Sequence, residues 1–165
     1  MKKLLFALIF CSLSSCQLFE PKPESEKFYC KLNGKAWRPE KNGTSLGTNL
    51  KAEWNKKGLF NIYAYGAKEL INFSVVVDSK GIQVKEYKLS SIKGKGESVG
   101  FYYYDYTISS QNRDELTSND GFVNITKIGN NQVSGTFEFT TRSSIQNKNY
   151  KITRGQFNNL TYSAF

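Results

Sequence analysis

Apolar and polar residues alternate with a period of two along most of the chain after residue 27. In the stretch Leu46–Trp54, for example, Leu50, Ala52 and Trp54 fall on one face and polar residues on the other. This period is typical of half-buried β-strands. No segment after the first 15 residues repeats its apolar residues with the 3.6-residue period of a helix. The pattern therefore predicts an all-β domain.

Gly, Asn, Asp and Ser clusters separate the alternating runs and predict turns between them. Asn33-Gly34 is the strongest hairpin signal, because both residues tolerate the positive φ angles of a type I′ turn. Ser110–Asp120 is the longest predicted loop, and a short helix over Gln111–Thr117 is an alternative within it. The predicted strands are Phe28–Leu32, Lys35–Arg38, Leu46–Trp54, Leu59–Tyr65, Leu70–Val77, Ile82–Leu89, Ser98–Ser109, Gly121–Ile128, Gln132–Thr141 and Tyr150–Tyr162.

Strands joined in order by short turns predict an antiparallel meander, which closes as a two-layer β-sandwich or a flattened barrel. Within it, Gly135 and Gly155 interrupt strands next to Phe137 and Phe157. A glycine inside a strand indicates a bulge or a close backbone approach. Residues 28–165 are expected to form one such domain.

The first 15 residues have the layout of an export signal, with Lys2-Lys3 followed by an apolar run and small residues. The run is shorter than the roughly 20 residues that span a membrane as a helix. Ser14 and Ser15 precede Cys16 as in a lipoprotein cleavage site. We expect cleavage between Ser15 and Cys16 and attachment of lipid to the Cys16 sulfur.

Residues 16–27 are expected to form the acylated N-terminus and a flexible tether. This segment contains Pro21, Pro23 and several Glu residues but few apolar side chains, a composition typical of solvated linkers. Gln17 takes the place of the Asp that commonly retains lipoproteins in the inner membrane of enteric bacteria. The expected location is therefore the cell envelope, at the outer membrane, with the leaflet left open.

The chain is basic, with a formal charge of +9, which falls to +7 without Lys2 and Lys3. Such a charge often indicates nucleic acid binding, but an exported protein meets little nucleic acid. Anionic lipid head groups or acidic polysaccharides are the available anions. Apart from Lys2-Lys3 and Lys56-Lys57 the lysines are nevertheless scattered singly, which favours a solvated surface.

Of the three cysteines, Cys11 is expected to leave with the signal and Cys16 to carry lipid, so Cys30 has no partner for an internal disulfide. Cys30 alternates with Phe28 and Leu32, which favours a buried apolar position over a reactive thiol or an intermolecular link.

A residue type that serves in many catalytic and metal sites is missing. The chain has no His, which excludes Ser-His-Asp triads and imidazole ligands. Asp114, Glu115 and Asp120 are too sparse to predict a calcium site. We expect no catalytic residue, no metal and no cofactor. Two carboxylates alone can hydrolyse glycosides, so a glycosidase is the enzymatic alternative.

The segment Phe101–Tyr106 is the best candidate for a binding surface. Tyr102, Tyr104 and Tyr106 would share one face of a strand, where exposed rings can stack on sugars or meet a partner strand. The alternative is that these tyrosines pair across strands and have no ligand.

Three motifs occur in order after the signal: Asn33-Gly34-Lys35-Ala36-Trp37, Ser134-Gly135-Thr136-Phe137-Glu138-Phe139 and Ile152-Thr153-Arg154-Gly155-Gln156-Phe157. Together they resemble an uncharacterised family of small lipoproteins from Bacteroidota. The resemblance implies an envelope location and an all-β domain, and it implies no activity and no functional residue.

The expected function is that of a lipid-anchored, non-catalytic β-domain that binds a glycan, a protein or an anionic envelope component. The alternative is a lipocalin-like carrier of a small apolar ligand, which needs an interior cavity of roughly 300 Å³ or more.

Overall fold

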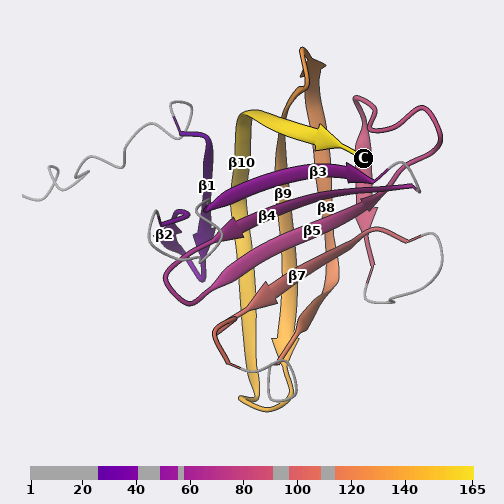
Figure 1. Cartoon of the computed structure of the whole chain (residues 1–165). Coiled ribbons are helices and arrows are strands. Elements are labelled where there is room, and N and C mark those ends of the chain that lie inside the picture. The colour runs from indigo at the N-terminus through magenta and orange to yellow at the C-terminus, as the bar shows by residue number, and fades with distance from the viewer. Residues whose placement is uncertain (1–25, 41–48, 56–57, 91–96, 109–113) are drawn as a thin grey trace, which may run out of the picture.

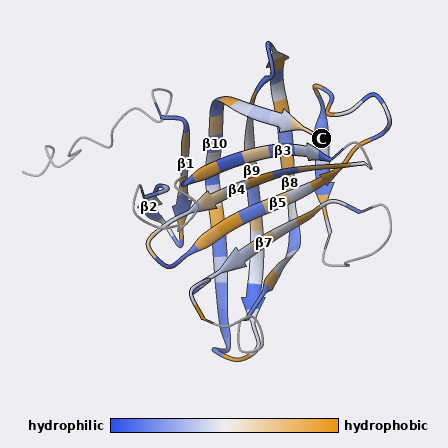
Figure 2. Cartoon of the chain, in the orientation of Figure 1, coloured by the Kyte–Doolittle hydropathy of each residue, from blue (hydrophilic) through white to orange (hydrophobic). Residues whose placement is uncertain are grey.

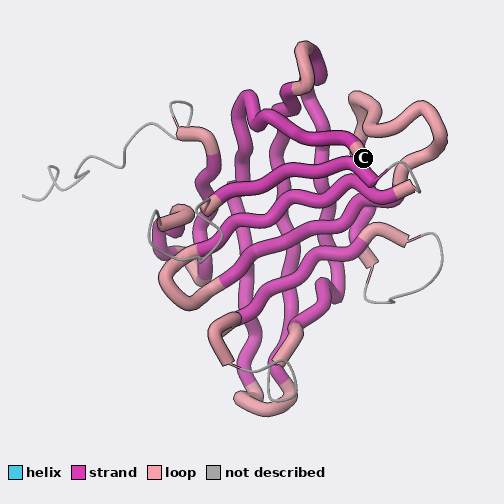
Figure 3. The backbone as a smooth tube through the Cα atoms, viewed as in Figure 1, coloured by secondary structure: helices cyan, strands magenta, loops and turns pink. Residues whose placement is uncertain are grey.

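A computed structural model of the chain describes residues 26–40, 49–55, 58–90, 97–108 and 114–165. All regular structure in these ranges is β-strand (Figure 3), which confirms the all-β prediction. The described part of the chain accordingly contains no helix that could cross a membrane. The strands are β1 (Phe28–Leu32), β2 (Lys35–Trp37), β3 (Leu50–Asn55), β4 (Leu59–Tyr65), β5 (Leu70–Val76), β6 (Glu86–Leu89), β7 (Val99–Tyr103), β8 (Leu116–Gly129), β9 (Gln132–Ser143) and β10 (Lys148–Ala164).

The strands close into a flattened barrel. Hydrogen-bonded neighbours run from β10 through β3, β4, β5, β7, β8 and β9 and back to β10. Figure 1 shows two layers, in which β3, β4, β5 and β7 run crosswise in front of the long strands β8, β9 and β10. The β1–β2 hairpin extends the back layer beside β10, and β6 extends it beside β8.

The predicted all-β flattened barrel is confirmed, and the pairing of β10 with β3 is one of the places where it departs from a simple antiparallel meander. The last residues of β10 pair with β3 in the parallel direction, with Tyr162 opposite Ala52 and Ala164 opposite Trp54. This pairing joins the two layers on one side of the barrel. On the other side β8 joins them, because its first residues pair with β7 and the rest with β9.

Several predicted strand boundaries moved, two of them by at least five residues and for tertiary reasons. β7 ends at Tyr103, whereas the alternating pattern continues to Ser109. β8 begins at Leu116, inside the predicted loop and the alternative helix, because Leu116 pairs with Tyr102 and buries its side chain. The prediction for residues 111–113 lies outside the described residues.

The predicted turn at Asn33-Gly34 is confirmed. Asn33 has φ of 50° and Gly34 has φ of 83°, the left-handed pair that a type I′ turn requires. The Asn33 side chain also accepts a hydrogen bond from the Lys151 backbone N–H at 2.8 Å. The turn therefore fixes the β1–β2 hairpin against β10.

Phenylalanine rings fill the centre of the barrel. The ring centroids of Phe73 and Phe137 lie 5.0 Å apart, and those of Phe73 and Phe157 lie 5.7 Å apart. Phe28 adds a ring 5.1 Å from Phe137. Figure 2 shows that β5, which carries Phe73, is largely hydrophobic along its length. A centre filled in this way argues against the interior ligand cavity of the carrier alternative.

Candidate functional site

A cleft of about 490 Å³ opens where β10 passes from one neighbour to the next. β10 pairs with β1 as far as Phe157, opposite Phe28, and with β3 from Tyr162. Between these two pairings β1 and β3 diverge and leave a gap beside residues 158–161. We call this hollow the junction cleft.

The junction cleft has an apolar floor and a polar rim. Phe28, Ala52 and Leu160 line it and also belong to the hydrophobic core. Glu26 and Arg38 line its rim, together with Lys27, Asn49 and Thr161. The volume lies within the roughly 300–1,000 Å³ of small-molecule sites, and the lining suits a ligand with an apolar body and a polar end.

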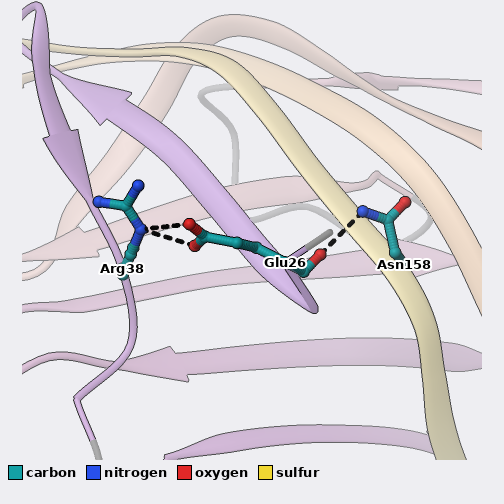
Figure 4. A network of polar contacts seen from close by, with 3 residues as sticks. All are labelled: Glu26, Arg38 and Asn158. Carbon is teal, nitrogen blue, oxygen red and sulfur yellow. Dashed lines mark hydrogen bonds and ion pairs between the residues drawn. The ribbon is translucent and has the colours of Figure 1, made fainter. Parts of the chain in front are cut away.

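A polar network holds the rim in place (Figure 4). The Arg38 Nε donates to both carboxylate oxygens of Glu26 at 2.6 Å. The Asn158 side chain donates to the Glu26 carbonyl at 2.8 Å, and its backbone N–H donates to the Lys27 carbonyl at 3.0 Å. The start of the domain is therefore fastened to both β10 and the end of the β1–β2 hairpin.

The guanidinium of Arg38 also covers the ring of Tyr29, with 5.2 Å between its Cζ and the ring centroid. Its Nη2 is buried and has no hydrogen-bond partner within the described part of the chain. Because Glu26 neutralises Arg38, the pair adds no net charge to the cleft.

The three tyrosines predicted to form one face do not do so. Tyr102 is only 2% exposed and lies in the core, 4.8 Å from Tyr150 between ring centroids. Burial raises its pKa well above the usual range. Because β7 ends at Tyr103, Tyr104 and Tyr106 leave the strand. Tyr104 packs against the edge of the core, and the Tyr106 ring contacts Tyr65 edge-on at 5.4 Å. The prediction of a continuous tyrosine face is wrong, and ligand binding by these residues stays a prediction.

The structure places Cys30 and the acidic residues Asp114 and Glu115, but it does not describe Ser15 and Cys16. Cys30 is fully buried, and desolvation raises the pKa of its thiol far above the usual value; this confirms the core interpretation. Ser15 and Cys16 lie outside the described residues.

Asp114 accepts a hydrogen bond from the Ser143 hydroxyl, and Glu115 accepts one from Tyr103, both at 2.5 Å. Within the described ranges no three His, Cys, Asp or Glu side chains gather as metal ligands would.

The sequence analysis did not identify the junction cleft. Glu26 lies in the predicted tether, and Arg38 ends a predicted strand as an ordinary polar residue. Neither position carries a local signal, since the network depends on β10, which is distant in sequence.

The fold and the cleft define a small β-barrel domain with a ligand-sized hollow at a layer junction. The chain belongs to the family described as Domain of unknown function (DUF6252), which matches residues 27–161. Neither the curated proteins nor the solved structures gave a match to this chain. The expected membership of an uncharacterised family is confirmed, while the origin in Bacteroidota stays a prediction.

Proposed function

We propose that this protein is a lipid-anchored component of the bacterial envelope, at the outer membrane, whose β-barrel acts as a non-catalytic binding module. The observation that carries the proposal is the order of Lys2-Lys3, an apolar run and Ser14-Ser15-Cys16 at the start of the chain. This order combines an export signal with a sulfur nucleophile at the first residue after the cut. Two attached acyl groups would hold the protein stably on a membrane.

The attachment of the barrel to its tether supports this arrangement. Glu26, which follows residues 17–25, is bound by Arg38 and Asn158. Nine residues reach at most about 30 Å when fully extended. The barrel would thus stay close to the membrane, and the junction cleft would lie at the end of the domain that the tether joins.

The chemistry of the junction cleft supports binding without catalysis. Glycoside hydrolysis needs two carboxyl groups roughly 5–9.5 Å apart across the cleft. Glu26 is the one carboxylate among the described residues that line this cleft, and Arg38 already engages it. The apolar floor instead favours a small ligand held at the surface. Because side chains fill the barrel centre, this is the remaining form of the carrier alternative.

Substitution of Cys16 tests the anchor. Cells that express the unaltered chain should incorporate labelled palmitate into the protein, and Cys16→Ser should abolish the label. Cys11→Ser is the matched control, since it makes the same change inside the expected signal and should keep the label. Acyl labelling decides the outcome, because an uncleaved signal would itself retain Cys16→Ser in the membrane fraction. Undiminished labelling of Cys16→Ser would show that the anchor proposal is wrong.

A further inference from the structure

A second hollow, of about 300 Å³, lies on the outer face of the back layer. Side chains from four strands line it: Tyr29 and Lys31 of β1, Phe122 of β8, Glu138 of β9, and Arg154 and Gln156 of β10. We call it the Arg154 groove.

An extra residue in β10 places Arg154 at this groove. Ile152 and Gly155 lie opposite Phe139 and Phe137, so three steps along β10 match two along β9. The same mismatch occurs against β1, where Thr153 and Gln156 lie opposite Lys31 and Tyr29. Such a bulge redirects a side chain and often marks a functional site.

The backbone at the bulge is unusual. Arg154 has φ of 51°, a left-handed conformation that is uncommon for a long side chain. Its N–H donates to the Glu138 Oε1 at 2.9 Å, which stabilises the bulge from the neighbouring strand. Unfavourable backbone conformations persist where the surrounding structure enforces them, and they concentrate at ligand sites.

The groove presents more donors than acceptors. Arg154 and Lys31 are cations, and the Gln156 Nε2 is buried without a hydrogen-bond partner in the described ranges. Glu138 is the one acid among the described lining residues, and the Arg154 N–H already occupies one of its oxygens. The terminal torsion of a Gln side chain is soft, so a small rotation would direct its N–H into the groove. This lining is complementary to an anion that brings several acceptor oxygens.

One aromatic wall restricts the class of ligand. Phe122 is half-buried and forms part of the groove wall, whereas Tyr29 is 2% exposed and its ring is covered by the Arg38 guanidinium. A bare anion makes no use of the Phe122 ring, whereas a sugar ring packs its C–H face on it. We propose that the Arg154 groove binds a sugar unit that carries a carboxylate, as in the uronic acids of acidic polysaccharides, with the carboxylate on the Arg154 guanidinium. The inference goes beyond the junction cleft, because it adds a second site on another face of the proposed binding module.

Titration of the detergent-solubilised full-length protein with trigalacturonate tests this site, and its methyl ester is the matched ligand. Calorimetry or NMR should show saturable binding of the acid and at least tenfold weaker binding of the ester. Arg154→Asn, which tolerates the left-handed backbone, should weaken binding of the acid at least tenfold. Gln156→Glu, which replaces the donor by a like charge, should do the same. Lys127→Asn removes one positive charge from an exposed site on β8 and should change affinity less than twofold.

Several results would overturn the proposal. These are no saturable binding by wild-type protein with a normal melting curve, equal binding of acid and ester, or equal losses in Arg154→Asn and Lys127→Asn. Displacement of the sugar by an equal concentration of inorganic phosphate would show a bare anion site instead. The titration is done in detergent and the acyl labelling is done in cells. A negative result for sugar binding can therefore be distinguished from a negative result for lipid attachment.

Discussion

The ring of Phe157 lies directly against the backbone of Gly135, its partner across β9 and β10. A Cβ at Gly135 would come within 2.6 Å of the Phe157 Cζ. The reverse contact occurs two residue pairs away, where a Cβ at Gly155 would come within 2.6 Å of the Phe137 ring. The second and third of the three sequence motifs therefore interlock, and each supplies the glycine that the other's phenylalanine needs. This confirms the close backbone approach predicted at both glycines.

The first prediction concerns this interlock. Gly135→Ala and Gly155→Ala should each lower the free energy of unfolding by about 3 kcal/mol, because the added methyl group overpacks a filled core. Gly129→Ala is the control, since nothing lies within 4 Å of a Cβ at that position, and it should change stability by less than about 0.5 kcal/mol. Urea denaturation measures all three. Equal effects at Gly129 and Gly135 would contradict the packing argument.

The second prediction concerns the turn between β1 and β2. Gly34→Ala should cost about 1–2 kcal/mol, because Gly34 has φ of 83° and L-residues avoid this region. No atom lies within 4 Å of the new Cβ, so the cost is conformational and not steric. Gly34→Asn should recover much of the loss, since Asn tolerates the left-handed region. Thermal unfolding compares the two variants, and an Asn variant no better than Ala would refute this explanation.

The third prediction concerns the polar network at the junction cleft. Arg38→Lys should lower stability by about 1 kcal/mol, because an ammonium replaces neither the Nε contact with Glu26 nor the planar contact with Tyr29. The magnitude is modest because the Arg38 side chain is 35% exposed. Exchange of the Asn158 amide hydrogen, which bonds to the Lys27 carbonyl, should become faster. Arg142→Lys, at an exposed position on β9, should leave that exchange rate unchanged.

The fourth prediction concerns Cys30. Its raised pKa keeps the thiol protonated in the folded protein, so iodoacetamide should not label it between pH 7 and pH 10, whereas an ordinary thiol becomes reactive above about pH 8.5. Denaturant should expose it to rapid labelling. The unfolded chain releases this proton at about pH 8.5, and the folded one does not. The thiol's contribution to the free energy of unfolding is therefore fully present below that pH and decreases as the pH rises above it. Labelling of Cys30 itself in the folded protein at pH 9 would contradict the assignment.

Local sequence patterns predicted the strands well where one face of a strand is buried. The predicted and observed bounds of β1 and β4 coincide, because alternation and turn residues act over a few neighbouring positions. Residues 116–120 were misjudged, since their polar sequence has no alternation and their strand conformation comes from pairing with β7 and β9. The tyrosine prediction failed for the converse reason: alternation continued along the sequence after β7 had lost its partners at Tyr103.

The junction cleft and the Arg154 groove were not predictable from their own residues. The junction cleft exists because β10 changes partner between Phe157 and Tyr162. The Arg154 groove exists because β10 carries an extra residue relative to both neighbours. The motif containing Arg154 was visible in the sequence, but its glycine and phenylalanine suggested packing alone.

The sequence by itself determined the all-β class, the turn at Asn33-Gly34 and the burial of Cys30, because periodicity, turn chemistry and side-chain polarity are properties of adjacent residues. The tertiary structure decided how the barrel closes, through the parallel pairing of β10 with β3, and where its hollows lie. Those features depend on which distant strand supplies each hydrogen-bond partner. Pairing energies between distant strands are summed over the whole fold, so no local pattern encodes them.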